Sequence, residues 1–223
     1  MLRNLLIMIL VVSISFLALI IGLEENAYDL EYYQRSFEDN GVYEVTGKSE
    51  SELMNISRDV IEYLKGRNDS LLDEHFNQRE IHHMEDVLKL FDLARLIKFT
   101  SFILTIASGA YFILRLDTKF AGKWIAIGLS ANYFIVAIIG ILAKTDFTKY
   151  FIRFHELFFT NDLWILDPRT DLLIQMLPEP FFINIAVKIA VSFIKYVAFG
   201  QLIGYILYRK GTYEIGKFKW QRM

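Results

Sequence analysis

The apolar residues of this chain gather in four stretches that are long enough to cross a membrane. A helix needs about 20 mainly apolar residues to span roughly 30 Å of hydrocarbon, and a helix satisfies its own backbone hydrogen bonds there. The stretches run approximately over Leu5–Leu23, Leu96–Leu114, Trp124–Ala143 and Phe182–Tyr208. The pattern therefore predicts four transmembrane helices.

The first stretch shares one property with signal peptides, because Arg3 precedes its apolar run. The run is long for the apolar region of a signal peptide, however. The sequence Leu23-Glu24-Glu25-Asn26 that follows also contains no small-x-small cleavage site. We therefore expect the first stretch to remain as an uncleaved anchor.

The polar segment between the first two stretches, residues 24–95, shows two kinds of pattern. Asn40-Gly41 is a turn-forming pair between residues 31–37 and 42–46, and it predicts a short β-hairpin. Two helices are predicted after the hairpin. The first has Ser49 and Ser51 as candidate N-caps, and the second runs from about Asn77 to Arg95. The first helix has apolar residues every three or four positions: Leu53, Ile56, Val60 and Leu64. The segment is thus predicted to be a small mixed α/β domain.

The segment between the third and fourth stretches, residues 144–181, is unusually apolar for a loop. Its aromatic and aliphatic residues fall on one helical face: Phe147, Tyr150, Phe151, Phe154, Leu157 and Phe158. This spacing is typical of a helix that lies in the headgroup layer of a bilayer. Asp167-Pro168 then predicts the N-cap and first residue of a short helix that continues to about Met176.

Charge distribution predicts the orientation of the chain. The segment from Glu24 to Arg95 holds eight basic and eighteen acidic residues, a net charge of −10. The loops on the other side hold only two acidic residues, Asp117 and Glu214, against nine basic ones. The basic residues are Arg3, Arg115, Lys119, Lys123, Arg209, Lys210, Lys217, Lys219 and Arg222. Because basic loops stay in the cytoplasm, we expect both termini to be cytoplasmic.

These patterns together predict a mainly α, polytopic membrane protein. The expected division is a first transmembrane helix (1–23), an extracytoplasmic domain (24–95), two transmembrane helices (96–143), an extracytoplasmic interfacial loop (144–181), a fourth transmembrane helix (182–208) and a cytoplasmic tail (209–223). A membrane is the expected location, and the family resemblance described below implies that it is a bacterial cell membrane. The hydrophobic fraction of 54% agrees with this class.

Composition removes several classes of function. The chain contains no cysteine, so disulfides, thiolate metal sites and a thioester intermediate are excluded. The net charge of −2 and the acidic outer segment argue against nucleic-acid binding, which needs a basic face.

All four histidines, His75, His82, His83 and His155, fall in the two segments predicted to lie outside. Imidazole suits proton transfer near neutral pH because its ordinary pKa is about 6.5. His83 has Asp86 three residues on, and His155 is followed by Glu156, so each imidazole has a carboxylate in reach to fix its tautomer. Two other interpretations stay open: interfacial histidines with ordinary hydrogen bonds, and a metal site that uses His75, His82 and His155.

Three further residues have a functional and a structural interpretation each. Trp164 belongs either to a substrate platform or to an aromatic belt at the membrane interface. Asn161 is either an oxyanion donor or a C-cap. Lys195 falls near the middle of the fourth stretch, where a charge is costly, so it either lines a substrate cavity or is structural.

Two motifs carry a resemblance to a known family. The sequences Glu80-Ile81-His82-His83-Met84-Glu85-Asp86-Val87 and His155 to Pro168, together with Asp171 and the four-span layout, resemble the bacterial lipoprotein intramolecular transacylase family. The likeness extends over nearly the whole chain. It implies that the sn-2 acyl chain of a diacylglyceryl-modified N-terminal cysteine is moved onto the α-amine of that cysteine, which gives a lyso-form lipoprotein. It also places the catalytic histidines at His83 and His155.

This reaction suits the residues available. A histidine can act as base toward an α-amine, and an imidazole, an amide or a backbone N–H can stabilise the oxyanion. We therefore assign His155 the base and acid role and His83 the positioning or oxyanion role. Asp86 and Asp167 are expected to orient the site. Trp164 and the phenylalanine face are expected to hold acyl chains. No cofactor and no metal are required, and the expected partners are a diacylated lipoprotein and membrane lipid.

Two other functions are compatible with parts of the sequence. One is a membrane-bound binding or sensor protein whose histidines respond to pH or to a metal. The other is a small-solute transporter that uses Lys195, although four spans without a repeat are unusual for a transporter. The sequence does not fix the oligomeric state.

Overall fold

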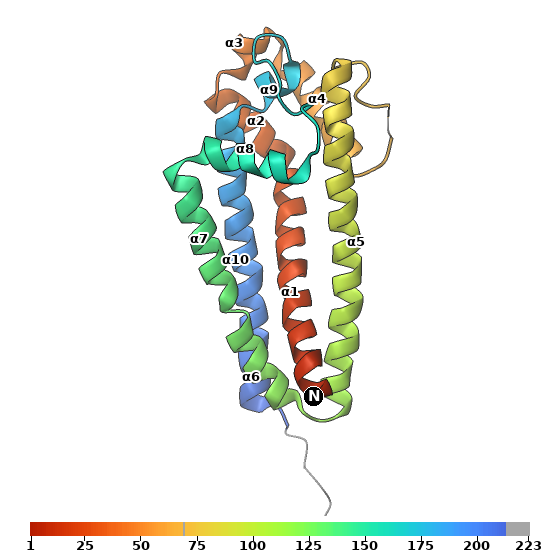
Figure 1. Ribbon diagram of the computed structural model, residues 1–223, viewed down its shortest axis with the longest axis vertical. Helices are drawn as coiled ribbons and strands as arrows, with labels where there is room; N and C mark the ends of the chain where they lie inside the picture. The colour runs from red at the N-terminus through yellow and green to blue at the C-terminus, as the bar shows by residue number, and fades with distance from the viewer. Residues whose placement is uncertain (69, 213–223) are drawn as a thin grey trace, which may run out of the picture. The chain divides into compact units, whose positions relative to one another are not determined.

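The computed structural model describes residues 1–68 and 70–212, and in these residues it is helical without any strand (Figure 1). Along the chain the helices are α1 (Leu2–Ala27), α2 (Leu30–Asp39), α3 (Val42–Thr46), α4 (Glu50–Leu64), α5 (Gln78–Leu114), α6 (Thr118–Gly128), α7 (Ala131–Thr145), α8 (Phe147–Phe158), α9 (Leu172–Met176) and α10 (Glu179–Lys210). Most of the expected tail falls at residues 213–223, outside the described residues, and with it Glu214, Lys217, Lys219 and Arg222.

Four helical segments are long and apolar enough to cross a membrane, as the sequence predicted. They are α1, α5, α6 with α7 (Thr118–Thr145), and α10. The predicted helix from Asn77 to Arg95 and the predicted span Leu96–Leu114 prove to be one continuous helix of 37 residues, α5. Because about 20 residues are enough to span the hydrocarbon, the polar part of α5 before Leu96 extends beyond the span.

The chain divides into two compact units. The first comprises residues 1–21, 97–137 and those from 192 onward. Its core residues are Ile7, Leu10, Ala18, Phe112, Ala121, Ile125, Leu129, Phe193 and Val197. α6 and α10 approach each other closely, because a Cβ on Gly122 would lie 2.5 Å from the carbonyl oxygen of Gly204. Small residues permit such close contact between membrane helices.

The helix break between α6 and α7 is compensated by a side chain. At the break, the Ser130 backbone N–H bonds to Ile127 rather than to Ala126. The Gln201 amide donates to the freed Ala126 carbonyl at 2.9 Å, and its oxygen accepts from the Tyr133 hydroxyl at 2.6 Å. An irregular backbone is tolerated at membrane depth when neighbouring side chains bond it in this way.

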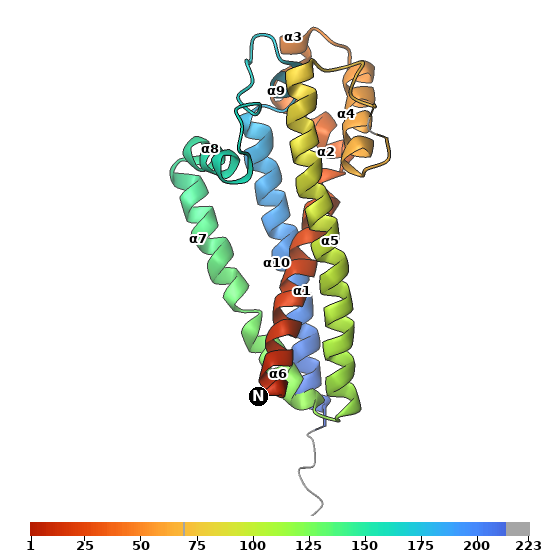
Figure 2. The same ribbon diagram turned by 45° about the vertical axis from the view of Figure 1, so that its right-hand side comes forward.

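The second unit comprises residues 22–96 and 138–191. Its core contains residues from both predicted outer segments: Tyr32, Tyr33, Phe37, Val42, Leu53, Ile56, Val60, Ile61, Tyr63, Leu64, Leu72, Phe76, Ile81, Met84, Leu173, Met176, Leu177 and Phe181. The interfacial loop therefore completes the core that residues 24–95 could not bury alone. Figure 2 shows α8 nearly end-on, so its axis is steeply inclined to that of the first turns of α10.

The predicted β-hairpin is wrong, and with it the mixed α/β character of the segment. Residues 31–37 and 42–46 belong to helices α2 and α3. The buried residues of α2 are Tyr32, Tyr33, Ser36 and Phe37, which is the spacing of a helix face and not the alternation of a strand. Gly41 has φ +64° and links the two helices instead of turning a hairpin.

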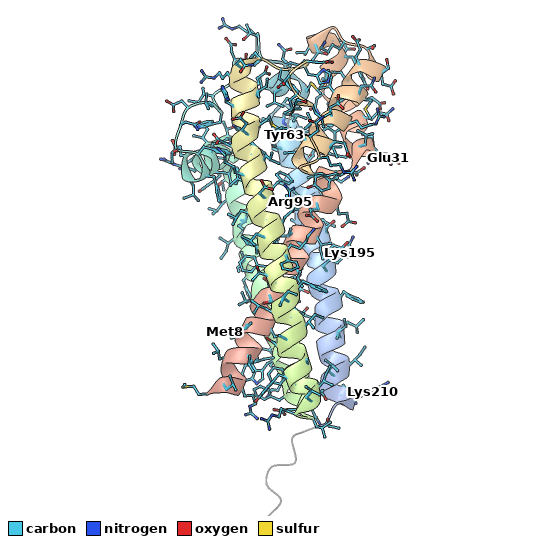
Figure 3. All side chains as sticks on the ribbon, turned by 90° about the vertical axis from the view of Figure 1, so that its right-hand side faces the viewer. Met8, Glu31, Tyr63, Arg95, Lys195 and Lys210 are labelled. Carbon is cyan, nitrogen blue, oxygen red and sulfur yellow. The ribbon has the colours of Figure 1, made fainter. Side chains whose placement is uncertain are left out.

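The helix predicted after Ser49 is confirmed as α4. The Ser49 hydroxyl accepts from the Glu52 N–H while Glu52 bonds back to the Ser49 N–H, which forms a capping box. At the other end, the Arg95 guanidinium donates to the Leu64 carbonyl at 2.6 Å, which satisfies one of the terminal carbonyls of α4. Figure 3 labels Arg95 on α5.

The helix predicted from the aromatic face of residues 147–158 is confirmed as α8 (Phe147–Phe158). Its place in the headgroup layer stays a prediction. The short helix predicted to start at Asp167 begins later. Asp167 to Thr170 form a turn in which the Asp171 N–H donates to the Asp167 carbonyl at 2.9 Å. Asp171 is the N-cap of α9.

Candidate active site

Helices α5 and α8 bring His83 and His155 together. The centroids of the two imidazole rings lie 6.0 Å apart, and the ring planes are inclined by 36°. Both residues are buried, with 8% and 9% of their surface exposed. His83 lies in the polar part of α5, before the predicted span, and His155 lies near the end of α8. The second unit therefore contains a pair of buried imidazoles from two distant parts of the sequence.

The tautomer of His155 is fixed by the backbone of its own helix. Its Nδ1 lies 2.7 Å from the Phe151 carbonyl oxygen. A carbonyl oxygen only accepts, so Nδ1 carries the hydrogen and Nε2 keeps its lone pair when the ring is neutral. Burial lowers the pKa of His155 below its ordinary value, and the hydrogen bond to Phe151 opposes this in part. His155 is thus a neutral base near pH 7.

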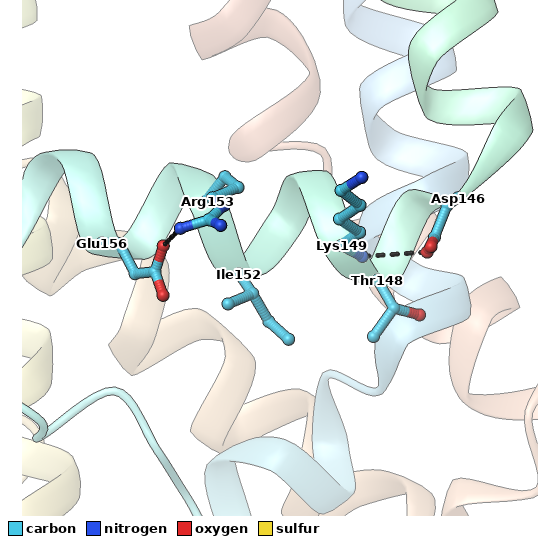
Figure 4. A pocket seen from close by; sticks show the side chains of 6 residues that line it. All are labelled: Asp146, Thr148, Lys149, Ile152, Arg153 and Glu156. Carbon is cyan, nitrogen blue, oxygen red and sulfur yellow. Dashed lines mark hydrogen bonds and ion pairs between the residues drawn. The ribbon is translucent and has the colours of Figure 1, made fainter.

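Glu156 does not fix that tautomer, contrary to the expectation from its position beside His155. Its carboxylate accepts from the Arg153 guanidinium at 2.6 Å on the exposed side of α8. Figure 4 shows this pair in a pocket of about 380 Å³ that is also lined by Asp146, Thr148, Lys149 and Ile152.

His83 differs from His155 in its hydrogen bonding. Its Nδ1 is buried and has no hydrogen-bond partner among the described residues. The pKa of His83 is lowered to about 4: burial is the largest cause, the neighbouring His155 also lowers the pKa, and the charge of Asp86 opposes both. A neutral ring with an unused nitrogen inside the site can donate a hydrogen bond to a bound group or accept one from it.

Aromatic side chains surround the imidazole pair, with Phe151 and Phe154 of α8 against His155 at centroid distances of 4.5 and 5.5 Å and two more from the residues after α8. The Trp164 ring stacks on His155 with centroids 4.9 Å apart and an interplanar angle of 29°. The Phe159 ring meets His83 edge-on at 5.3 Å and lies 5.6 Å from His155. Sequence reasoning singled out Trp164 but missed Phe159. The only available signal was its place just after the aromatic run of α8.

Asp86 and Asn161 are brought together beside His83. The Asn161 side-chain amide donates to Asp86 Oδ2 at 2.8 Å, while its own oxygen accepts from the Leu163 N–H at 3.0 Å. Asp86 Oδ1 accepts from Lys89 Nζ at 2.8 Å. These hydrogen bonds, with Lys89 as the largest cause, lower the pKa of Asp86. Asp86 is therefore ionised near pH 7.

The start of α5 is tied to the loop that follows α8. Glu80 is 1% exposed, and its carboxylate accepts from the Asn77 N–H at 2.8 Å and from the Leu173 N–H at 2.6 Å. The Asn77 amide also donates to Asp171 Oδ1 at 3.0 Å, and Asp171 Oδ2 accepts from the Asp167 N–H at 2.7 Å. This network lies one helical turn before His83, and Glu80 was not predicted as a site residue.

The Asp167 carboxylate, predicted to orient the site, accepts from the Arg169 guanidinium at 2.6 Å. This arginine holds the pKa of Asp167 at about 2. The part of Asp167 that enters the network around Glu80 is its backbone N–H, not its carboxylate.

The two remaining histidines lie outside the pair. His82 is exposed, with Nδ1 3.3 Å from Glu85, and His75 Nε2 lies 2.8 Å from Asp59. Of the neighbours His82 and His83, the inward-facing ring is therefore His83. Among the described residues, no group of three His, Cys, Asp or Glu side chains is arranged to hold a metal ion.

Lys195 lies on α10 within the first unit and is exposed (Figure 3). Its Nζ lies 4.6 Å from the centroid of the adjacent Tyr196 ring. Its predicted role in a substrate cavity stays a prediction.

The fold and the imidazole pair describe a class of molecule, a helical integral membrane protein with two buried histidines on crossing helices. Comparison with known families narrows this class. The model of the family described as "Lipoprotein intramolecular transacylase Lit" matches residues 6–182, so the chain belongs to that family. Membership supports an acyltransferase role.

Solved structures share the fold. The lipoprotein intramolecular transacylase Lit from Bacillus cereus is 22% identical, with a TM-score of 0.73 over 93% of this chain and 94% of that chain. A variant of the same protein with one histidine changed to alanine is also 22% identical and gives a TM-score of 0.74 over 93% of this chain and 92% of that chain. A search of curated proteins gives no match.

Proposed function

We propose that this protein transfers the sn-2 acyl chain of a diacylglyceryl-modified lipoprotein to the α-amine of the same N-terminal cysteine. The observation that carries the proposal is the buried imidazole pair, with ring centroids 6.0 Å apart, on a chain of the transacylase family. In the reaction the amine nitrogen bonds to the ester carbonyl carbon, and the bond from that carbon to the sn-2 oxygen breaks. The amine proton moves to the sn-2 oxygen.

His155 is the proton carrier in this proposal. Its Nδ1–H is held by the Phe151 carbonyl, so Nε2 is the atom that takes the proton from the attacking amine. The imidazolium formed then returns this proton to the departing sn-2 oxygen. No acyl-enzyme is needed, because the nucleophile and the ester belong to one molecule. A well-oriented intramolecular reaction of this kind reaches an effective molarity of about 10⁵ M or more.

His83 stabilises the tetrahedral oxyanion or positions the ester. Because its pKa is about 4, the ring stays neutral near pH 7 and does not repel the imidazolium of His155. A neutral imidazole with an N–H turned toward the ester oxygen supplies one hydrogen bond to the developing charge, and such donors typically contribute 10²–10³-fold to the rate. Phe159 and Trp164 keep both rings in place.

The acyl chains require an apolar surface beside the rings. Several large apolar side chains of α8 and the following loop are exposed: Ile152, Phe154, Leu157, Phe158 and Ile165. An exposed apolar patch of this kind marks a membrane or lipid contact. We place this surface in the outer leaflet of a bacterial cell membrane, with both termini in the cytoplasm, on the charge distribution of the sequence.

The direct test is conversion of a synthetic diacylglyceryl lipopeptide by the purified protein in micelles, followed by mass spectrometry with fragmentation. We expect an isomer of unchanged mass whose α-amine is acylated and whose sn-2 hydroxyl is free, with and without a chelator. No isomerisation by the purified protein contradicts the proposal. Activity that disappears with chelator favours a metal-dependent site instead.

The pH dependence of kcat/KM follows from the base role of His155. Burial places its pKa below 6.5, so the ring is already neutral between pH 6.5 and 8. The free α-amine, with a pKa of about 8, is then the group whose deprotonation limits the rate. We expect kcat/KM to rise about tenfold per pH unit from 6.5 toward 8, and to fall more steeply only at lower pH. A break to the steeper slope above pH 6.5 contradicts the assignment.

A further inference from the structure

Asp86 presents one oxygen to a part-buried partner, Asn161, and the other to an exposed one, Lys89. Oδ2 is held by the side-chain amide of Asn161, which itself is fixed by the Leu163 N–H. Oδ1 is held by Lys89 Nζ at 2.8 Å, three residues along α5. The carboxylate side chain is 19% exposed, whereas that of Lys89 is 72% exposed. Asn161 thus orients the carboxylate, and Lys89 only covers its outer oxygen.

The bond between Asp86 and Lys89 can be exchanged at little cost. An exposed pair spaced by three residues on a helix contributes about 0–1 kcal/mol, because water screens it and the long lysine side chain loses entropy. The group at the end of Lys89 is an alkylammonium ion. The free N-terminus of a lipoprotein carries the same chemical group below its pKa of about 8.

The position of Asp86 is right for the nucleophile of the proposed reaction. His83 and Asp86 are spaced by three residues on α5, so they share a face of the helix. His83 in turn lies against His155. A cation bound at Asp86 Oδ1 therefore lies on the face of α5 that carries the imidazole pair.

We propose that Asp86 Oδ1 binds the α-ammonium of the substrate's N-terminal cysteine, and that Lys89 occupies this position in the free enzyme. The inference rests on the proposed function and deepens it, because it assigns a binding group to the amine. Substrate binding replaces one ammonium by another on the same oxygen, so the charge of the site is conserved. The bound ammonium loses one proton to solvent water before the nitrogen attacks the ester, which is the deprotonation with a pKa of about 8. The neutral amine then gives its next proton to His155 Nε2, which returns it to the sn-2 oxygen, and the carboxylate remains ionised.

The test uses two lipopeptide analogues that cannot react, because ether bonds replace both esters. One carries the α-amine and the other an α-hydroxyl group, and their dissociation constants are measured with the full-length protein at pH 6.5. We expect the wild-type protein to bind the amine analogue about tenfold or more tightly than the hydroxyl analogue. D86N should abolish this preference, while K89M should tighten amine binding several-fold by removing the competing ammonium.

E85Q is the matched control, because Glu85 is the adjacent carboxylate but faces outward and contacts His82. It removes the same charge as D86N and should leave the preference for the amine unchanged. The proposal is overturned if the wild-type protein shows no preference, if E85Q loses it as D86N does, or if K89M binds the amine analogue more weakly. Thermal unfolding of each variant checks its fold.

Failure of this inference can be told apart from failure of the proposed function. Analogue binding needs no turnover, whereas the proposed function is tested by isomerisation of the diester lipopeptide. An enzyme that isomerises the lipopeptide but shows no amine preference refutes only the role of Asp86.

Discussion

Replacing His155 by alanine is expected to lower kcat for acyl transfer by about 10³-fold, within the 10²–10⁴ range typical of a lost general acid and base. The same ring accepts the amine proton and returns it to the sn-2 oxygen, so no other group in the proposed reaction takes its place. His83→Ala should lose a comparable factor, because it removes the donor to the oxyanion. The measurement is the rate of lyso-form appearance at saturating lipopeptide, followed by mass spectrometry.

Two further variants separate lost chemistry from lost packing. H155F keeps an aromatic ring against Trp164 and Phe159 but has no nitrogen, so it should be as inactive as the alanine variant. H82A changes the adjacent histidine, which is exposed and contacts Glu85, and should keep nearly full activity. Activity in H155F near the wild-type level, or a loss in H82A equal to that in H83A, would show that the imidazoles are assigned wrongly.

The apolar spans and the helix α8 could be predicted because length and apolar spacing determine them directly. A run such as Leu96–Leu114 has few alternatives to a membrane helix, and the aromatic face of α8 repeats every three or four residues. The hairpin failed for the opposite reason. Asn40-Gly41 is compatible with either a hairpin turn or a helix boundary, and burial of Tyr32 and Tyr33 against Phe181 decided between them. That contact joins residues far apart in the sequence.

The candidate site shows the same division between local and long-range information. The motifs pointed to His83 and His155, but the neighbours that define their chemistry come from the fold. The Phe151 carbonyl, not Glu156, orients His155, because the α-helix brings the backbone four residues earlier beneath the ring. Phe159 and Glu80 lie within the two motifs, but local spacing assigns a role to neither. Their roles appear only when the loop after α8 packs on α5.

Glu80→Ala is expected to lower the free energy of unfolding by about 2–4 kcal/mol. The substitution leaves the buried Leu173 N–H and the part-buried Asn77 N–H without their acceptor, and a buried unsatisfied group costs about 1–3 kcal/mol. Thermal or denaturant unfolding of the purified protein in micelles measures the change. E85A, which truncates an exposed glutamate on the same helix, should change the stability by less than about 0.5 kcal/mol.

Hydrogen exchange gives this prediction a local readout. In the wild-type protein the Leu173 amide is bonded to Glu80 and should exchange slowly, whereas in the Glu80→Ala variant it should exchange much faster than neighbouring amides of α10. E80Q keeps the volume but offers one oxygen for two donors, so one of the two amides should lose protection and the stability should fall between those of the wild type and the alanine variant. The loop between α8 and α9 also carries Trp164, which stacks on His155. Because the Glu80→Ala variant attaches this loop less firmly to α5, the stacking should weaken and kcat should fall. If Leu173 keeps its protection in the alanine variant, Glu80 does not join α5 to α9.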